Sequence, residues 1–333
     1  LDILAKQEGG AARADRNAVH KACREAVRQY VAEELGGLEN KTARFQYLFR
    51  RLVHSAEQIL ENVVEELRVS DFRPIDYELD FSYNGDLPPV QCTDGDVSIS
   101  LTGKVDRVDG YIRNGRLYLR VMDYKSGHKS FSLSDIWYGL NMQLIIYLYA
   151  LQREGLERYR ARLTDELNEI VPAGVLYVPV RDELPDEKRS IDEDELNTEK
   201  EKLLRRSGLL SDDMSILEAM ERGLEDKGRF IPVALKKKKG EEEASFASGS
   251  AVADLAKFGR LARYTQKKLL EMGQELRRGS VEANPRRSDR SYCDWCEFRA
   301  ACRFDETAGD KMRPLRKLKD EEVWEQLGGD ENA

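Results

Sequence analysis

The chain has 333 residues, of which 35% are charged and 41% hydrophobic, and its formal net charge is −8. This length allows one large domain or two, with a core of useful size. The longest apolar run, 144–151, is too short to span a bilayer, which excludes a membrane-spanning helix. The acidic balance excludes a protein coated with DNA-binding basic surface, although it is compatible with a local basic groove.

The cysteines are unevenly placed, with Cys23 and Cys92 alone and three more at 293–302. We find no signal-peptide pattern, and an odd cysteine count without secretion signals favours a reducing compartment over disulfides. We therefore expect a cytoplasmic protein. The first residue is Leu1 and not methionine, which favours a fragment or a processed chain.

The first elements in chain order are two helices, expected at 17–35 and 42–69 from their apolar periodicity. A strand follows, because apolar and acidic residues alternate. One face would carry Ile75, Tyr77, Leu79 and Phe81, and the opposite face Asp76, Glu78 and Asp80. Further strands are expected at about 96–111 and 116–124, and a core strand at 174–180.

A largely apolar helix is expected at 134–153, with Ser134 as a candidate N-cap, and a long amphipathic helix at 251–278. Between them the composition becomes strongly charged, which favours a solvated insertion over a DNA-binding patch because neighbouring acids cancel its basic run. The resulting division is a helical region 1–70, an α/β core 71–180, a charged insertion 181–250, a long helix with the cysteine cluster 251–310, and a charged tail 311–333.

The dipeptide Asn114-Gly115 predicts a tight hairpin, because both residues tolerate the positive φ of a type I′ turn. This turn sets the register so that Asp106 lies directly opposite Asp123. Lys125 then shares a face with Asp123, because strand side chains alternate. Like charges opposite each other repel, so a divalent metal such as Mg²⁺ between the two acids would stabilise the pair.

Two interpretations of these acids stay open on the local pattern: a metal site, or a solvated strand end that Lys125 neutralises. The same register places Asp109 opposite Arg120 on the other face, which favours a structural ion pair.

Gln143 and Tyr147 are polar exceptions in the apolar helix and share one face. A buried Gln143 either completes a hydrogen-bond network in the core or points into the site. His128 is better explained as a surface loop residue.

Several motifs together resemble the RecB-type nucleases of the PD-(D/E)XK superfamily, and more narrowly the C-terminal nuclease domain of the AddB family. They are Gly103-Lys-Val-Asp106-Arg-Val-Asp109, Asp123-Tyr-Lys125-Ser-Gly127, Tyr138-Gly-Leu140, Gln143-x-x-x-Tyr147 and the Glu-Ala-Asn-Pro run at 282–285. The resemblance extends from about Thr42 to Asp305.

The resemblance implies that Asp106 and Asp123 bind the metal and that Lys125 orients or activates the attacking water. Gln143 and Tyr147 would position Lys125 or the nucleic-acid strand. Glu78 would be a further acidic ligand, although simple solvation explains it equally well.

Cys293-x-x-Cys296 with Cys302 fits an incomplete zinc site or an iron–sulfur site equally well. The resemblance implies three ligands of a [4Fe–4S] cluster, with the fourth ligand outside this chain, because Cys23 lacks the family's Pro-Phe context. The family's metal-associated histidine is also unmatched, since His20 has Arg16 where a glycine is expected. We therefore expect the chain to begin after both motifs.

The resemblance implies an α/β fold, a restriction-endonuclease-like mixed sheet flanked by helices, with a helical cysteine-rich region at the C-terminus. The implied activity is Mg²⁺-dependent exonuclease cleavage of single-stranded DNA ends, of the 5′-ended strand, in double-strand-break repair with an AddA-like partner. No nucleotide-hydrolysing loop occurs in the sequence, so helicase activity would reside elsewhere. The alternatives are a non-catalytic DNA-binding scaffold with a vestigial site, or another RecB-like or Cas4-like exonuclease.

Overall fold

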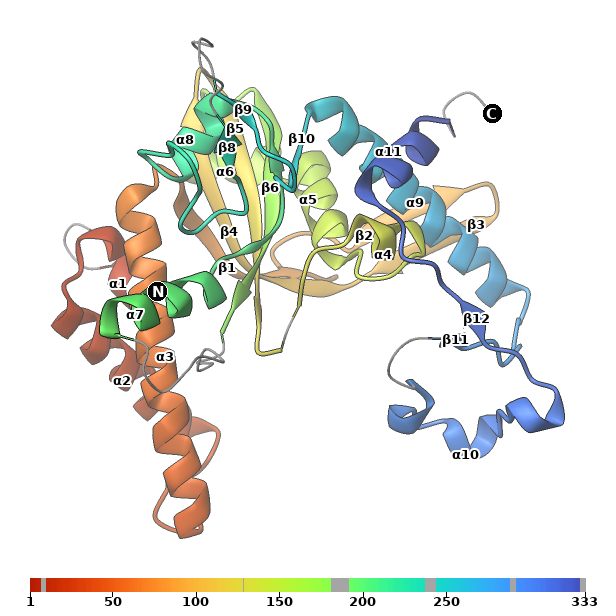
Figure 1. The fold of residues 1–333 in the computed structure, drawn as a ribbon, viewed down its shortest axis with the longest axis horizontal. Helices are drawn as coiled ribbons and strands as arrows, with labels where there is room; N and C mark the ends of the chain where they lie inside the picture. The colour runs from red at the N-terminus through yellow and green to blue at the C-terminus, as the bar shows by residue number, and fades with distance from the viewer. Residues whose placement is uncertain (7–9, 128, 181–191, 237–243, 288–291, 330–333) are drawn as a thin grey trace.

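A six-stranded mixed sheet forms the centre of the molecule, in the order β1-β4-β5-β6-β7-β10 (Figure 1). The structure is a computed structural model that describes residues 1–6, 10–127, 129–180, 192–236, 244–287 and 292–329. Its strands are β1 Arg73–Phe81, β4 Gly103–Arg113, β5 Arg116–Lys125, β6 Glu169–Pro179, β7 Ser207–Ser211 and β10 Val252–Ala253. The pairs β5–β6 and β7–β10 are parallel and the other neighbours are antiparallel. The predicted α/β fold with a mixed sheet is confirmed.

The β4–β5 hairpin has the predicted register. Arg113 lies opposite Arg116, and Asp109 lies opposite Arg120. The turn residues Asn114 and Gly115 have φ values of +52° and +71°, in the left-handed region that a type I′ turn requires.

Helices cover both faces of this sheet (Figure 1). On one face, α3 Ala43–Val69 packs through Val63, Val64 and Leu67 against a cluster that Tyr124 joins. On the other face, α5 Gln143–Glu154 and α9 Leu255–Arg277 close the main core. The helices α2 Arg16–Glu33 and α3 begin at side-chain caps, Asp15 and Thr42, within a residue or two of the predicted starts.

The single helix predicted at 134–153 is wrong. It is broken into α4 Leu133–Trp137 and α5, because Gly139 (φ +75°) and Asn141 (φ +54°) adopt left-handed conformations that end a helix. The cap is Ser132, whose hydroxyl accepts a hydrogen bond from the Asp135 N–H at 3.1 Å. The predicted cap Ser134 is instead buried, and its hydroxyl accepts from the Leu318 N–H.

The prediction of a solvated charged insertion is wrong for much of its length. β7 joins the central sheet, and α8 Met214–Met220 buries Ile216, Leu217 and Met220 in a second core. Short apolar runs within a highly charged segment caused this error, because average composition conceals them. The helix α7 Glu193–Leu203 does carry a charged surface, and the Lys/Glu runs at 237–243 lie outside the described residues.

The remaining elements are short. They are α1 Asp2–Ala5, η1 Ala11–Arg13, β2 Val90–Asp94, β3 Val97–Leu101, α6 Leu156–Arg162, β8 Leu235–Lys236, β9 Ser245–Phe246, β11 Arg286–Arg287, η2 Tyr292–Trp295, α10 Arg299–Cys302, η3 Glu306–Ala308, β12 Arg313–Pro314 and α11 Asp320–Gly329. The C-terminal cysteine region is therefore helical only in single turns. None of the described helices combines the length and apolar character needed to cross a bilayer.

Candidate active site

Three acidic residues lie at one level of three neighbouring strands. Glu78 of β1 stands between the pairs Tyr77–Arg107 and Leu79–Val105, which places it across from Asp106 of β4. The β4–β5 ladder ends with Arg107 opposite Met122, and the same register continued by one residue puts Asp123 of β5 across from Asp106. The acids that the sequence singled out therefore come from adjacent strands.

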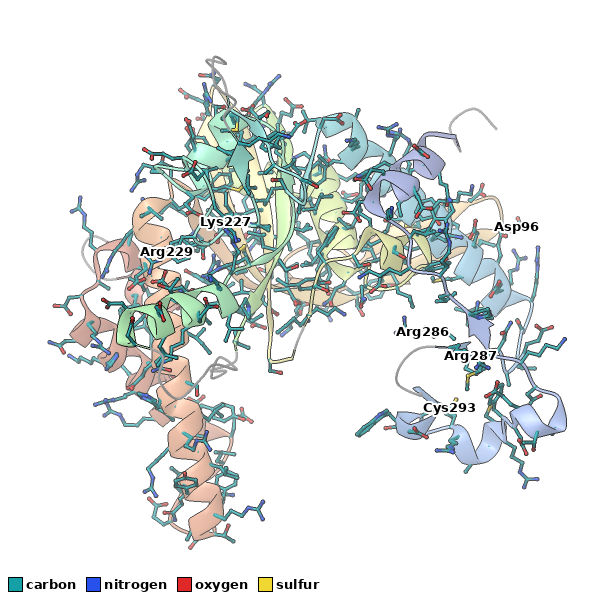
Figure 2. The ribbon with its side chains drawn as sticks, in the orientation of Figure 1. Asp96, Lys227, Arg229, Arg286, Arg287 and Cys293 are labelled. Carbon is teal, nitrogen blue, oxygen red and sulfur yellow. The ribbon has the colours of Figure 1, made fainter. Side chains whose placement is uncertain are left out.

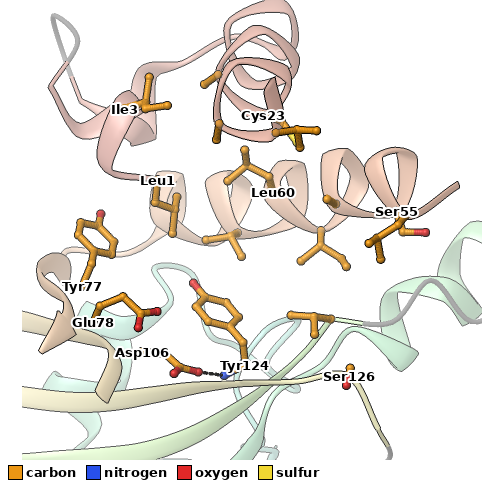
Figure 3. Close-up of a pocket in the computed structure, with 18 residues that line it drawn as sticks. Leu1, Ile3, Cys23, Ser55, Leu60, Tyr77, Glu78, Asp106, Tyr124 and Ser126 are labelled. Atoms are coloured by element: carbon orange, nitrogen blue, oxygen red, sulfur yellow. Dashed lines mark hydrogen bonds between the residues drawn. The ribbon is translucent and has the colours of Figure 1, made fainter. Parts of the chain in front are cut away.

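Beyond the last backbone pair of β4 and β5, a side chain of β4 takes over the hydrogen bonding between the two strands. The Oδ2 of Asp106 accepts a hydrogen bond of 2.7 Å from the Tyr124 N–H, as the dashed line in Figure 3 marks. Arg107, the next residue of β4, donates from Nη1 to the Tyr124 hydroxyl at 2.8 Å. Two consecutive residues of β4 thus hold one residue of β5, which fixes the orientation of the Asp106 carboxylate.

Glu78 has an unusual backbone for a non-glycine residue, with φ at +49°. Strained conformations of this kind cost about 1–3 kcal/mol and concentrate at functional sites. The local twist also breaks the predicted alternation, because Leu79 and Phe81 enter the main core whereas Tyr77 turns to the α3 side. The prediction that Tyr77 shares their face is therefore wrong.

Glu78 and Asp106 line a cavity of about 580 Å³ between the sheet and the helices α2 and α3 (Figure 3). The rest of its wall is mostly apolar, with Cys23 from α2, Leu60 from α3 and the ring of Tyr124. The carboxylates of Glu78 and Asp106 thus face a cavity whose wall is otherwise mostly apolar.

Asp123 is buried, with 4% of its surface exposed, and its Oδ2 lies 2.6 Å from the Lys125 ammonium. Burial raises the pKa of Asp123, the Lys125 contact lowers it, and repulsion from Asp106 raises it further. The two aspartates are therefore close enough to interact electrostatically. The interpretation as a solvated strand end does not hold for Asp123, although Lys125 does neutralise it.

Behind this level lies a network of fully buried charges. Asp109 accepts from Arg107 at 2.7 and 2.8 Å and from Arg120 at 2.9 Å, so its predicted ion pair with Arg120 is confirmed. Sequence reasoning missed Glu66 of α3, which lies 3.1 Å from Arg120 and accepts from Arg206 at 2.8 Å. Burial raises the pKa of Glu66, but the surrounding guanidiniums lower it to about 2. An acid within the apolar face of α3 was the signal that could have revealed it.

The sequence profile of the PD-(D/E)XK nuclease superfamily matches residues 4–303, which is most of the chain. The chain belongs to the PD-(D/E)XK nuclease superfamily.

Curated relatives are named as one subunit of an ATP-dependent helicase/deoxyribonuclease. The protein from Acetivibrio thermocellus is 33% identical over 93% of this chain, and one from Clostridium botulinum is 34% identical over 91%. One from Clostridium acetobutylicum is 30% identical over 91% of the chain. The chain spans 26% of the length of each of these relatives.

Within this PD-(D/E)XK core, Gln143 and Tyr147 do meet, since the Gln143 amide donates to the Tyr147 hydroxyl at 3.4 Å. Tyr147 is buried and stacks on Phe81 with ring centroids 5.6 Å apart, and its hydroxyl occupies the space that a Cβ on Gly103 would need. Gln143 is exposed, so the expectation of a buried glutamine is wrong. Among the described residues Lys125 forms its ion pair with Asp123, and no contact with Gln143 or Tyr147 is seen.

The acids of this candidate site would suit Mg²⁺, which prefers oxygen ligands and is commonly held by one or two carboxylates plus water and phosphate. No three Cys, His, Asp or Glu side chains converge on one metal position in the part of the chain that the structure describes. Asp106 and Asp123 therefore fit such a sparse ligand set, with Glu78 next to them on β1.

The cysteine cluster does not fit its predicted metal centre. Cys296 and Cys302 are exposed and Cys293 is half-buried, and these described residues do not gather into a ligand group. The [4Fe–4S] prediction is therefore not supported. Figure 2 labels Cys293, Arg286 and Arg287 in the segment that projects from the sheet. Cys23 lies in α2, within the helix predicted at 17–35, and Cys92 is buried in β2. His128, which the sequence placed in a surface loop, lies outside the described residues.

Proposed function

We propose that this chain is the Mg²⁺-dependent nuclease domain of an AddB-like protein, and that it cleaves single-stranded DNA ends during double-strand-break repair in the cytoplasm. The observation that carries the proposal is the position of Asp106 and Asp123 on adjacent strands, with Lys125 on Asp123. The names of the relatives support a deoxyribonuclease and a second subunit.

In this proposal the two aspartates bind the ion through carboxylate oxygens that are not engaged by other groups of the protein. Asp106 offers one carboxylate oxygen, because the Tyr124 N–H occupies the other. When bound, Mg²⁺ polarises the scissile phosphate and lowers the pKa of the attacking water. Glu78, across from Asp106, would supply a further oxygen ligand to the same ion, either directly or through a bound water.

Lys125 carries the complementary charge in the proposed reaction. Its ammonium lies against Asp123, at the edge of the acidic level, and is about one-third exposed. It would donate hydrogen bonds to the phosphate oxygens as negative charge grows on them, and would orient the attacking water. Exonuclease mode, preference for the 5′-ended strand and an AddA-like partner belong to the proposal through the family resemblance.

A second candidate is a DNA-binding module with a vestigial site. One observation favours it: an oxygen of Asp123 already engages Lys125, and no three-ligand group is present in the described residues. This candidate predicts DNA binding that is insensitive to Mg²⁺, with no cleavage.

The test is digestion of strand-labelled single- and double-stranded DNA with and without Mg²⁺, using the chain alone and with its partner subunit. We expect Mg²⁺-dependent cleavage of the single strand, which Asp123→Asn or Lys125→Ala lowers by at least about 10²-fold. Glu169→Gln is the matched control, because Glu169 pairs with Arg116 at the far end of the same hairpin. Cleavage retained in Asp123→Asn, or no cleavage by the unaltered protein, would contradict the proposal.

A further inference from the structure

A second lysine lies beside the candidate site and has no part in the mechanism above. Lys129 follows β5, and its Nζ lies 5.8 Å from the centroid of the Tyr177 ring. Tyr177 stands directly opposite Asp123 in the β5–β6 ladder, so Lys129 lies on the Asp123 side of the sheet. Two ammonium groups, those of Lys125 and Lys129, therefore accompany Asp123.

The position of Lys129 is fixed by the break between α4 and α5. Its ammonium donates to the Asn141 side-chain oxygen, and the Asn141 amide donates to Asp135 at 2.6 Å. Asn141 is one of the two left-handed residues that end the apolar helix early. A continuous helix would carry Asn141 elsewhere, so the break directs an acceptor at Lys129 and orients its ammonium.

Lys129 has no directly paired carboxylate among the described residues, although Asp135 and Asp123 attract its ammonium from farther away. Asp123 already contacts Lys125 at 2.6 Å, and among the described residues no carboxylate oxygen lies within 4.0 Å of the Lys129 ammonium. Burial, followed by repulsion from Lys125, lowers the pKa of Lys129; attraction to Asp135 and Asp123 opposes this, and Arg286 adds a smaller repulsion. A bound Mg²⁺ would increase the positive charge further, which an anionic ligand would relieve.

We propose that Lys129, oriented by Asn141, binds a backbone phosphate of the DNA strand next to the phosphate that is cleaved. The proposal rests on the proposed function, because it takes Asp123 to mark the reacting phosphate. An ammonium has three donors, and Asn141 uses one of them. No described residue accepts a hydrogen bond from the other two, and they can donate charge-assisted hydrogen bonds to non-bridging phosphate oxygens, which strengthens binding without reading the base.

Lys257 provides a matched control within the same chain. Its ammonium also lies over an aromatic ring, 5.5 Å from Trp324, but it belongs to α9 and packs against α11. Comparing substitutions of the two lysines thus separates the effect of removing a partly buried lysine from an aromatic ring from the effect of removing a phosphate ligand.

The experiment measures binding of a fluorescent single-stranded oligothymidylate by anisotropy, in EDTA so that no cleavage occurs, over a range of salt concentrations. Lys129→Gln is expected to weaken binding by about tenfold and to reduce the slope of log K against log salt by about 0.7, the value of one phosphate contact on a single strand. Lys129→Arg should keep most of the affinity, and Lys257→Gln should match the unaltered protein.

Equal affinity and slope in Lys129→Gln and Lys257→Gln would overturn the proposal. Thermal unfolding of each variant separates misfolding from lost binding, and recovery by Lys129→Arg excludes a purely structural role. Binding is measured apart from cleavage, so a chain that binds through Lys129 but never cleaves would contradict the nuclease proposal and leave this contact established.

Discussion

The β4–β5 hairpin and the cysteine segment, 292–302, both carry sequence patterns that predict a metal, but the fold organises only one of them. In the hairpin, Asp106 and Asp123 come from strands inside a six-stranded sheet, and Asp123 is 4% exposed. In the cysteine segment Trp295 is 85% exposed and Phe298 is 73% exposed, next to exposed thiols. Ligand spacing therefore predicts a site only where packing holds the ligands in place.

The difference follows from what anchors each region. The hairpin has a type I′ turn at one end and the Arg107–Tyr124 contact at the other, with buried ion pairs behind it. The cysteine segment follows β11, which pairs with β12 over two residues. In Figure 1 it lies away from the sheet.

The largest expected effect comes from breaking the buried anchor of the hairpin. Asp109→Ala leaves Arg107 and Arg120 buried without their shared carboxylate, which should cost about 3–5 kcal/mol in the free energy of unfolding. Cys296→Ser, in the cysteine segment, should change it by less than about 0.5 kcal/mol. Urea unfolding of both variants measures the contrast. A similar loss in both would show that the cysteine segment is anchored as firmly as the hairpin.

A smaller effect is expected from loosening the hairpin without unfolding it. Tyr124→Phe keeps the N–H that bonds to Asp106 but removes the hydroxyl that Arg107 holds. Outer contacts of this kind typically change metal affinity by about tenfold or more, so the Mg²⁺ concentration for half-maximal cleavage should rise about tenfold. Tyr111→Phe is the control, since Tyr111 is in the same hairpin and packs on Phe72. Identical Mg²⁺ titrations for the two variants would contradict this role.

The smallest expected effect concerns the stability of the site without metal. Burial raises the pKa of Asp123, so its ionisation opposes folding once the pH exceeds the usual value for an aspartate, and this cost is absent below it. In EDTA, Asp123→Asn should therefore raise the melting temperature slightly at pH 7 and leave it unchanged near about pH 3. Glu169→Gln, at an exposed position, should show no such pH-dependent gain. A lower melting temperature of Asp123→Asn at pH 7 would mean that the Lys125 contact outweighs burial.

The sequence was sufficient for the hairpin because its rules are local. The turn preference of Asn114-Gly115 and the two-residue period of strands fix the register, and the register fixes which residues face Asp106 and Asp109. The family resemblance then added Glu78 as a candidate ligand, although no named motif contains it. Its position across from Asp106 needed the β1–β4 pairing.

Other features depend on contacts between distant segments. The Glu66–Arg206 pair joins α3 to the start of β7, and β7 itself is a short apolar run within charged sequence. The break at Gly139–Asn141 competes with a strong helical period, and the contacts of Asn141 with Lys129 and Asp135 hold its left-handed conformation. Propensity and periodicity could not predict these, because tertiary contacts overrode them.

The buried ion pairs also limit how this hairpin could be reused in protein engineering. Transplanting residues 103–125 alone onto another scaffold would leave Arg107 and Arg120 without the acid that α3 supplies. The stability effects of substitutions within such a network are not additive. A stable graft would therefore have to include α3, Arg206 and β7 as well. The smallest portable form of this hairpin is thus a multi-segment unit, not a contiguous peptide.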